Sequence, residues 1–120
     1  MDKGVIVNNI ISDLKSQQPE KIRASILGFE SPYAIGFKDA ESGFYPDIIM
    51  EKDGSIDIIS VETTIEKKVS KKDKKRWRLF RIFAKANQGN LYLAGTPHNL
   101  SIIKNSMENI PSNLKFIHLV

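Results

Sequence analysis

The sequence of 120 residues contains no cysteine and only two histidines, His98 and His118. Without cysteine the chain can form neither disulfides nor thiolate metal sites, and two widely separated imidazoles do not suggest a zinc centre. His98 stands in a Thr-Pro-His-Asn turn, where a contribution to a helix cap is expected. His118 falls in the last apolar segment, where a structural role in a strand is expected.

Long apolar runs are also missing. No stretch approaches the roughly 18 to 20 apolar residues that a membrane helix needs, and the N-terminal Met-Asp-Lys-Gly lacks the basic-then-apolar order of a signal peptide. These features predict a cytoplasmic protein with no membrane association. With 41% hydrophobic and 27% charged residues, residues 1–120 are expected to form a single domain with one core.

The charge is unevenly distributed along the chain. Residues 1–65 hold six Lys or Arg against eleven Asp or Glu, whereas residues 66–85 hold ten Lys or Arg against two Asp or Glu. Such a concentration of positive charge is typical of a segment that contacts a phosphate backbone. A Lys-rich helix face that only keeps the surface solvated is the alternative, and the composition leaves both open.

The first part of the chain predicts a helix followed by an ambiguous segment. Apolar residues recur at helical spacing from Val5, and the helix should stop at Gln17-Gln18-Pro19. Residues 20–29 fit a short helix ending near Gly28, but also a strand in which the apolar side chains alternate. We prefer the helix.

A β-hairpin is the strongest local prediction. Residues 34–37 suggest a short strand, and two β-rich runs follow, Tyr45 to Met50 and Ile56 to Val61, separated by a turn that contains Asp53-Gly54. The two runs carry apolar residues on both faces of their strands. This pattern favours a central sheet covered by helices on both sides.

The second half alternates helices and strands. A basic amphipathic helix is expected from Ile65 to about Gln88, with its N-cap at Thr63-Thr64, Gly89 after its end, and Trp77 packed in the core. The remaining predicted elements are a strand at 91–95, a helix from about Asn99 to Ile110, and a last strand at 114–120.

Two carboxylates are placed to converge. Asp47 lies in the first strand of the hairpin and Glu62 ends the second, so a hairpin of this length can bring them close together. Two carboxylates at a strand end are the minimum needed to hold an octahedral cation such as Mg2+.

Pro46-Asp47 followed by Glu62-x-Thr64 resembles the signature of the PD-(D/E)XK nuclease superfamily, and the predicted order of elements is similar to its αβββαβ core. The resemblance implies an α/β, restriction-endonuclease-like fold with a mixed central sheet flanked by helices. It also implies that Asp47, Glu62 and the carbonyl group of Thr63 bind Mg2+ or Mn2+. A third acid, Asp13 or Glu20, would be a further candidate.

Thr64 stands where the superfamily pattern has Lys, the residue that orients and activates the nucleophile. The resemblance therefore requires another ammonium group, and Lys67, Lys68 or Lys71, after the second acid, could project one back towards the metal.

The predicted function is that of a small metal-dependent endonuclease or nuclease-like protein acting on DNA. Its phosphate contacts are expected at Lys71, Lys74, Lys75, Arg78 and Arg81. The alternative is a non-catalytic nuclease-fold domain that binds nucleic acid or a protein partner. A third interpretation is an interaction module whose basic helix contacts an acidic protein. The resemblance also suggests a homodimer.

Overall fold

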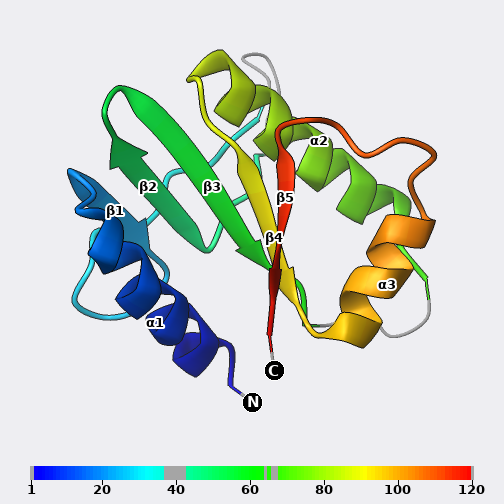
Figure 1. Ribbon diagram of the computed structural model, residues 1–120, viewed down its shortest axis with the longest axis horizontal. Helices are drawn as coiled ribbons and strands as arrows, with labels where there is room; N and C mark the ends of the chain where they lie inside the picture. The colour runs from blue at the N-terminus through cyan, green and yellow to red at the C-terminus, as the bar shows by residue number, and fades with distance from the viewer. Residues whose placement is uncertain (1, 37–42, 64, 66–67, 120) are drawn as a thin grey trace.

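The computed structural model describes residues 2–36, 43–63, 65 and 68–119. These residues form a mixed α/β fold in which helices flank a five-stranded sheet (Figure 1). Along the chain the elements are α1 (Lys3–Leu14), a 3-10 turn (Lys15–Gln17), β1 (Lys21–Ala24), β2 (Ile48–Lys52), β3 (Ser55–Val61), α2 (Lys71–Ala86), β4 (Leu91–Gly95), α3 (Pro97–Asn105) and β5 (Leu114–His118). Within this described part, no helix is long and apolar enough to cross a membrane.

The strands lie in the order β1-β2-β3-β4-β5. The first three form an antiparallel meander, and β4 and β5 continue the sheet parallel to β3. Parallel neighbours require crossover connections, and α2 and α3 provide them. The prediction of a mixed sheet in an α/β fold is confirmed.

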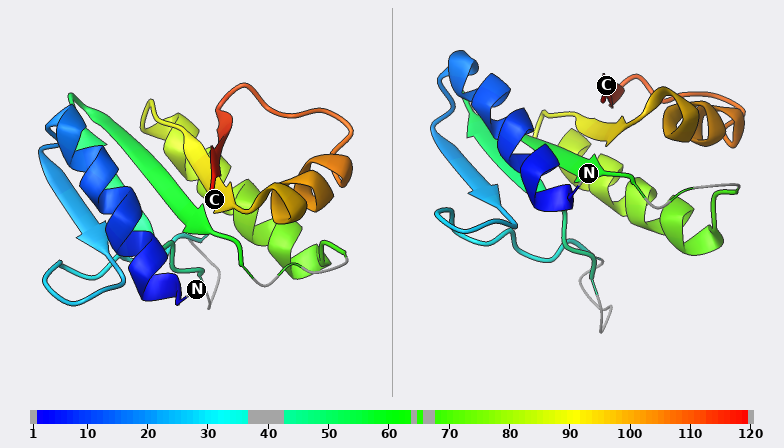
Figure 2. Two further views of the ribbon diagram at one scale, coloured as in Figure 1. Left: turned by 60° about the horizontal axis from the view of Figure 1, so that its bottom comes forward. Right: turned by 90° about the horizontal axis from the view of Figure 1, so that it is seen from below.

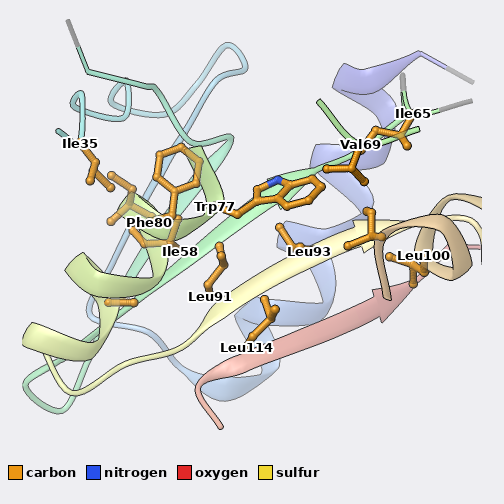
Figure 3. Packing of buried hydrophobic residues seen from close by; sticks show 13 residues of the cluster. Ile35, Ile58, Ile65, Val69, Trp77, Phe80, Leu91, Leu93, Leu100 and Leu114 are labelled. Carbon is orange, nitrogen blue, oxygen red and sulfur yellow. The ribbon is translucent and has the colours of Figure 1, made fainter. Parts of the chain in front are cut away.

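The sheet has a hydrophobic core on each face. Figure 2 shows α1 and α2 on opposite sides of the sheet. The core on the side of α2 and α3 (Figure 3) consists of Ile35, Ile49, Ile58, Ile65, Val69, Trp77, Phe80, Ala84, Leu91, Leu93, Leu100, Ile103 and Leu114. The core on the side of α1 consists of Ile6, Val7, Ile10, Ile11, Leu14, Ala24, Ile48, Met50, Ile59, Val61 and Ala94. Apolar residues on both faces of β2 and β3 are explained by these two layers.

The hairpin prediction is confirmed. β2 and β3 pair with Ile48 opposite Ile59 and Lys52 opposite Ser55, which leaves Asp53-Gly54 as the turn. Both turn residues have positive φ, 50° for Asp53 and 80° for Gly54. This is the type I′ geometry that matches the twist of the adjoining strands.

The preferred helix at residues 20–29 is wrong. Lys21–Ala24 forms β1, an edge strand in which Ile22 lies opposite Met50. Hydrogen bonds to β2 satisfy the backbone N–H and C=O groups of this short segment. The spacing of its apolar residues gives no information about that partner strand, so it could not predict the pairing. The predicted strand at 34–37 is also wrong as far as the structure describes it, because Ile35 forms only an isolated bridge with Phe44 and Phe37 lies outside the described residues.

Helix α2 begins later than predicted. Its N-cap is Ser70, which forms a capping box with Asp73, and this reciprocal pair fixes the start of the helix. Ile65 is buried in the core although it precedes the helix. Thr64, predicted to share in the cap, lies outside the described residues.

The ends of α2 and α3 also differ from the predictions. Gln88, not Gly89, adopts the left-handed conformation after α2, with φ of 59°. Gly89 is required for another reason, since a Cβ atom there would overlap the backbone carbonyl of Ile56. Helix α3 begins at Pro97 because Thr96 caps it, and it ends at Asn105, short of the predicted Ile110.

Candidate functional site

Asp47 is built into the sheet just before β2 begins. Its backbone N–H donates to the carbonyl of Ile59, and its carboxylate accepts the N–H of Val61 at 2.7 Å. The side chain of Asp47 thus continues the ladder between β2 and β3 beyond the last backbone pair. The ammonium group of Lys3, at the start of α1, lies 3.1 Å from the other carboxylate oxygen. Asp47 is only 7% exposed, and a buried charge of this kind needs such partners.

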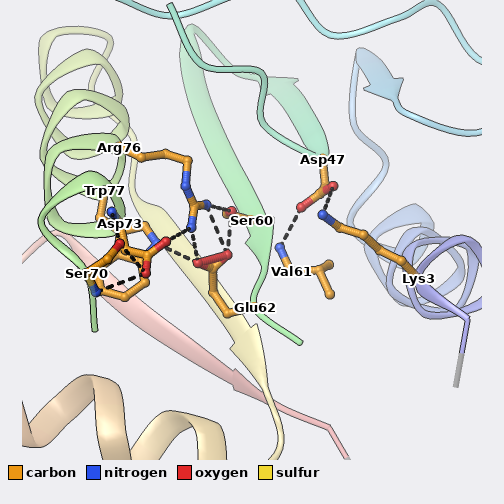
Figure 4. A network of polar contacts seen from close by, with 9 residues as sticks. All are labelled: Lys3, Asp47, Ser60, Val61, Glu62, Ser70, Asp73, Arg76 and Trp77. Atoms are coloured by element: carbon orange, nitrogen blue, oxygen red, sulfur yellow. Dashed lines mark hydrogen bonds and ion pairs between the residues drawn. The ribbon is translucent and has the colours of Figure 1, made fainter. Parts of the chain in front are cut away.

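Glu62 follows β3 and is 3% exposed. One carboxylate oxygen accepts from Arg76 and from the indole N–H of Trp77 at 2.7 Å. The other accepts from the hydroxyl of Ser60 at 2.9 Å and from Arg76 at 3.0 Å. The guanidinium group therefore binds both oxygens at once, and four donors surround one carboxylate (Figure 4).

Arg76 joins Glu62 to the first turn of α2. Its guanidinium also donates to Asp73 at 3.1 Å, so one cation lies between two carboxylates. Burial alone would lower the pKa of Arg76, but the hydrogen bonds and charges of Glu62 and Asp73 outweigh it and raise the pKa. Partial burial likewise pulls the pKa of Asp73 upward, but hydrogen bonds from Ser70 and Arg76 outweigh it and hold the pKa below its usual value.

The two predicted metal ligands are at one end of the sheet but have separate partners. Asp47 precedes β2 and Glu62 follows β3, and these strands are antiparallel neighbours. Figure 4 shows the two carboxylates on either side of β3, one with Lys3 and the other with Arg76. Among the described residues, no three His, Cys, Asp or Glu side chains are grouped so that they could hold a metal ion.

The candidate third acids lie apart from each other. Glu20 accepts the backbone N–H of Asp53 at 3.3 Å, which places it beside the hairpin turn at the other end of β2 and β3. Asp13 lies on α1, where its side chain lines the same cavity as Thr63. Neither acid contacts Asp47 or Glu62 in the described part of the chain.

Of the predicted catalytic lysines, those that the structure describes are not brought to the two acids. Lys67 lies outside the described residues. Lys68 and Lys71 are exposed at the approach to α2 and at its first residue, and neither is ion-paired in the part of the chain that the structure covers. The cation that does reach Glu62 is Arg76, which the sequence pattern grouped with the other basic residues of the helix. The sequence signal that could have identified Arg76 is its position next to Trp77, the residue predicted to pack in the core.

Most of the other basic residues of α2 are exposed. Lys71, Lys74, Lys75 and Arg78 project from α2 into solvent, and Arg81 is half-buried. Lys71, Lys75 and Arg78 follow an i, i+4, i+7 spacing, so they lie along one ridge of the helix. Of the basic residues in α2 itself, Arg76 alone forms an ion pair within the described structure. We call Lys71, Lys74, Lys75 and Arg78 the basic face.

Comparisons with known families, curated proteins and solved structures gave no significant match to this chain.

Proposed function

We propose that this chain is a nucleic-acid-binding domain with a nuclease-like αβββαβ core, and that in the arrangement described it binds DNA without cleaving it. The observation that carries the proposal is the contrast between the two kinds of cation on α2. Arg76 is used to neutralise Glu62, whereas the basic face is exposed and makes no ion pair among the described residues.

The basic face suits a phosphate backbone better than it suits a purely structural role. Solvated lysines on a helix do not need to follow one ridge, whereas Lys71, Lys75 and Arg78 do. At a rise of about 1.5 Å per residue, consecutive members of the ridge are spaced by about 4.5 to 6 Å along the helix axis, within reach of successive phosphates for long flexible side chains. DNA is the expected partner, and release of counterions would supply most of the affinity.

The state of Glu62 supports binding without catalysis. A metal ion at this carboxylate would have to displace the guanidinium of Arg76, the indole N–H of Trp77 and the hydroxyl of Ser60. Removing one partner from a buried ion pair costs about 3 to 5 kcal/mol because the other charge is left uncompensated. Mg2+ also keeps much of its own hydration shell and gives it up reluctantly.

A metal-dependent endonuclease is the second candidate. It is supported by the order of elements up to β4, which matches the αβββαβ order of restriction-endonuclease-like proteins, and by the position of Asp47 and Glu62 at one end of the sheet. In that case Asp47, Glu62 and the carbonyl of Thr63 bind Mg2+ or Mn2+ after Arg76 has moved away. A basic side chain such as Lys68 supplies the ammonium, and a homodimer encloses the duplex.

Salt-dependent binding tests the role of the basic face. The affinity for a 20-base-pair duplex would be measured by fluorescence anisotropy over a series of salt concentrations for the parent and for a variant with four Lys or Arg changed to Gln. The variant carries changes at Lys71, Lys74, Lys75 and Arg78. We expect the slope of log affinity against log salt to flatten by about 0.9 for each phosphate that the variant no longer neutralises.

A matched control separates local contact from total charge. Changing four basic residues elsewhere to Gln removes the same net charge, and the residues are Lys15, Lys52, Lys104 and Lys115. The slope of log affinity against log salt for the control should differ from that of the parent by less than about 0.9, which is the contribution of one neutralised phosphate. Equal slopes for the parent and the basic-face variant would reject α2 as the binding surface.

Cleavage assays distinguish the two candidates. Incubation of supercoiled plasmid with the parent and Mg2+ or Mn2+ should give no nicking above that of the Asp47→Asn protein. Metal-dependent nicking by the parent that Asp47→Asn abolishes would instead establish the endonuclease.

A further inference from the structure

A cavity of about 470 Å3 lies between α1 and the carboxyl-end edge of the sheet, and it extends to Asn99 at the start of α3. Its position follows from the topology. The strands β3, β4 and β5 are parallel, so their carboxyl ends meet at one edge of the sheet, where Thr63, Thr96 and His118 line the cavity. Crevices outside the carboxyl ends of parallel strands are the usual place for ligands in open α/β sheets.

The cavity exists because α1 covers only part of its face of the sheet. Helix α1 packs against β3, and within the described residues no helix lies over the same face of β4 and β5. Ile117 and Leu119 are therefore only partly buried, and they face the cavity opposite Ile6 and Ile10 of α1. A smaller cavity of about 160 Å3 continues along α1 and shares Ile117.

The walls would hold an apolar body. Ile6 and Ile10 contribute aliphatic surface from α1, and Ile117 and Leu119 contribute it from the end of β5. A volume of about 470 Å3 falls in the range of small-molecule sites, which bury most of a drug-sized ligand.

The polar residues that line the cavity favour a positively charged ligand over a negatively charged one. The cavity contains one carboxylate, that of Asp13, together with amides, hydroxyls and the imidazole of His118, and its described lining includes no Lys or Arg. The chain as a whole has a net charge of +4, so a lining without basic side chains is not a consequence of composition. Asp13 has no ion pair within the described structure, and it is an exposed residue although it lines the cavity, so its carboxylate lies at the solvent-accessible mouth.

From these observations we propose that the cavity binds a small organic amine, that is, a protonated amino group carried on an apolar body. The ammonium group pairs with Asp13 and donates to the side-chain oxygen of Asn9 or Thr63, and the apolar body packs between α1 and the end of β5. The site does not involve the basic face of α2, and the inference does not depend on DNA binding.

Three probes that share an indole ring test the charge preference. Tryptamine carries an ammonium group, tryptophol a neutral hydroxyl, and indole-3-propionate a carboxylate. Each would be titrated into the 15N-labelled protein and followed through the backbone amide signals of Thr63, Thr96 and His118. We expect tryptamine to bind at least about tenfold more tightly than indole-3-propionate, which corresponds to about 1.4 kcal/mol, with tryptophol between them.

Two variants connect this preference to the cavity. Asp13→Asn should remove most of the difference between tryptamine and tryptophol while tryptophol still binds. Ile10→Trp should fill the cavity and weaken all three probes, with the melting temperature checked for both variants. Asp53→Asn, a change of the same charge in the hairpin turn far from the cavity, is the control and should keep the parent's preference.

Several outcomes would overturn the proposal. One is that no probe shifts the three reporter amides at up to about 5 mM, a concentration that would detect even millimolar affinity. Others are that the acid binds as tightly as the amine, or that Asp13→Asn leaves the preference for tryptamine unchanged. If indole-3-propionate shifts only the amide signals of α2, it is attracted nonspecifically to the basic face. That result would also reject the proposal if tryptamine does not shift the amide signals of Thr63, Thr96 and His118.

Discussion

The guanidinium of Arg76 and the carboxylate of Glu62 bind each other through two N–H groups and two oxygens, between helix α2 and the end of β3. The pair is almost closed off from solvent on the carboxylate side, where Glu62 is 3% exposed. Because the bonds are bidentate, they fix both the rotation of α2 about its axis and its position along β3. The same contact makes Glu62 a poor site for a metal ion.

Breaking this pair from either side should be costly. Arg76→Met should lower the free energy of unfolding by about 3 to 5 kcal/mol, since it leaves the buried carboxylate of Glu62 without its charged partner. Glu62→Gln should cost less, because Arg76 still pairs with Asp73. The double variant Glu62→Leu with Arg76→Met should lose much less than the sum of the two changes. Urea unfolding of all four proteins measures this coupling, and simple additivity would show that the two side chains act independently.

Trp77 should stabilise the fold in two separable ways. Trp77→Ala removes a ring that is 3% exposed and should cost about 3 to 5 kcal/mol, whereas Trp77→Phe keeps most of the apolar contact and removes the N–H bond to Glu62, for about 1 to 3 kcal/mol. Thermal or urea unfolding provides the measurement. If Trp77→Phe were as damaging in a Glu62→Leu background as in the parent, the indole N–H bond would not be the cause.

The sequence predicted the structure correctly in the segments where the local pattern and the tertiary fold favour the same conformation. The Asp53-Gly54 turn, the apolar strands on both of its sides and the burial of Trp77 all follow from local chemistry. The helix predicted for residues 20–29 was wrong because their apolar spacing fits two periods, and only the pairing of Ile22 with Met50 decides between them.

The candidate site was harder to predict than the fold. The positions of Asp47 and Glu62 at neighbouring strand ends follow from the hairpin, but the direction of each side chain depends on the helices that cover the sheet. Lys3 of α1 and Arg76 of α2 come from opposite faces, and no local pattern assigns either to its acid. A buried carboxylate and its partner can be far apart in the chain, so spacing rules do not connect them.

Gln88 carries backbone strain that glycine would relieve. It has φ of 59° after the end of α2, a conformation that costs a residue with a side chain about 1 kcal/mol or more. Gln88→Gly should therefore raise the melting temperature, and Gly89→Ala should lower it because the added Cβ would overlap the carbonyl of Ile56. Calorimetry of both variants is the test. A stable Gly89→Ala protein would mean that the loop can move away from β3.

The capping box of α2 should make stability depend on pH. The pKa of Asp73 is held below its usual value in the folded protein, so its ionised form stabilises the fold above the usual pKa of about 3.9. This contribution should disappear as the pH falls through the lowered folded-state pKa, because the folded protein then takes up the proton as well. The difference in unfolding free energy between the parent and Asp73→Asn should thus be constant above about pH 5 and shrink as the pH falls through and below the usual pKa of the carboxyl group.

Ser70 provides the means to test the cause of this lowered pKa. Ser70→Ala removes the hydroxyl that donates to Asp73 and caps the helix, and it should cost about 1 kcal/mol at neutral pH. It should also raise the pKa of Asp73, which NMR titration of the Asp73 carboxyl group would follow directly. The ion pair with Arg76 remains in this variant, so the rise should be partial, and a further Arg76→Met change should extend it. If Asp73 titrates in Ser70→Ala as it does in the parent, Arg76 and the backbone N–H of Ser70 hold the carboxylate in its charged form, and the Ser70 hydroxyl does not affect the pH dependence.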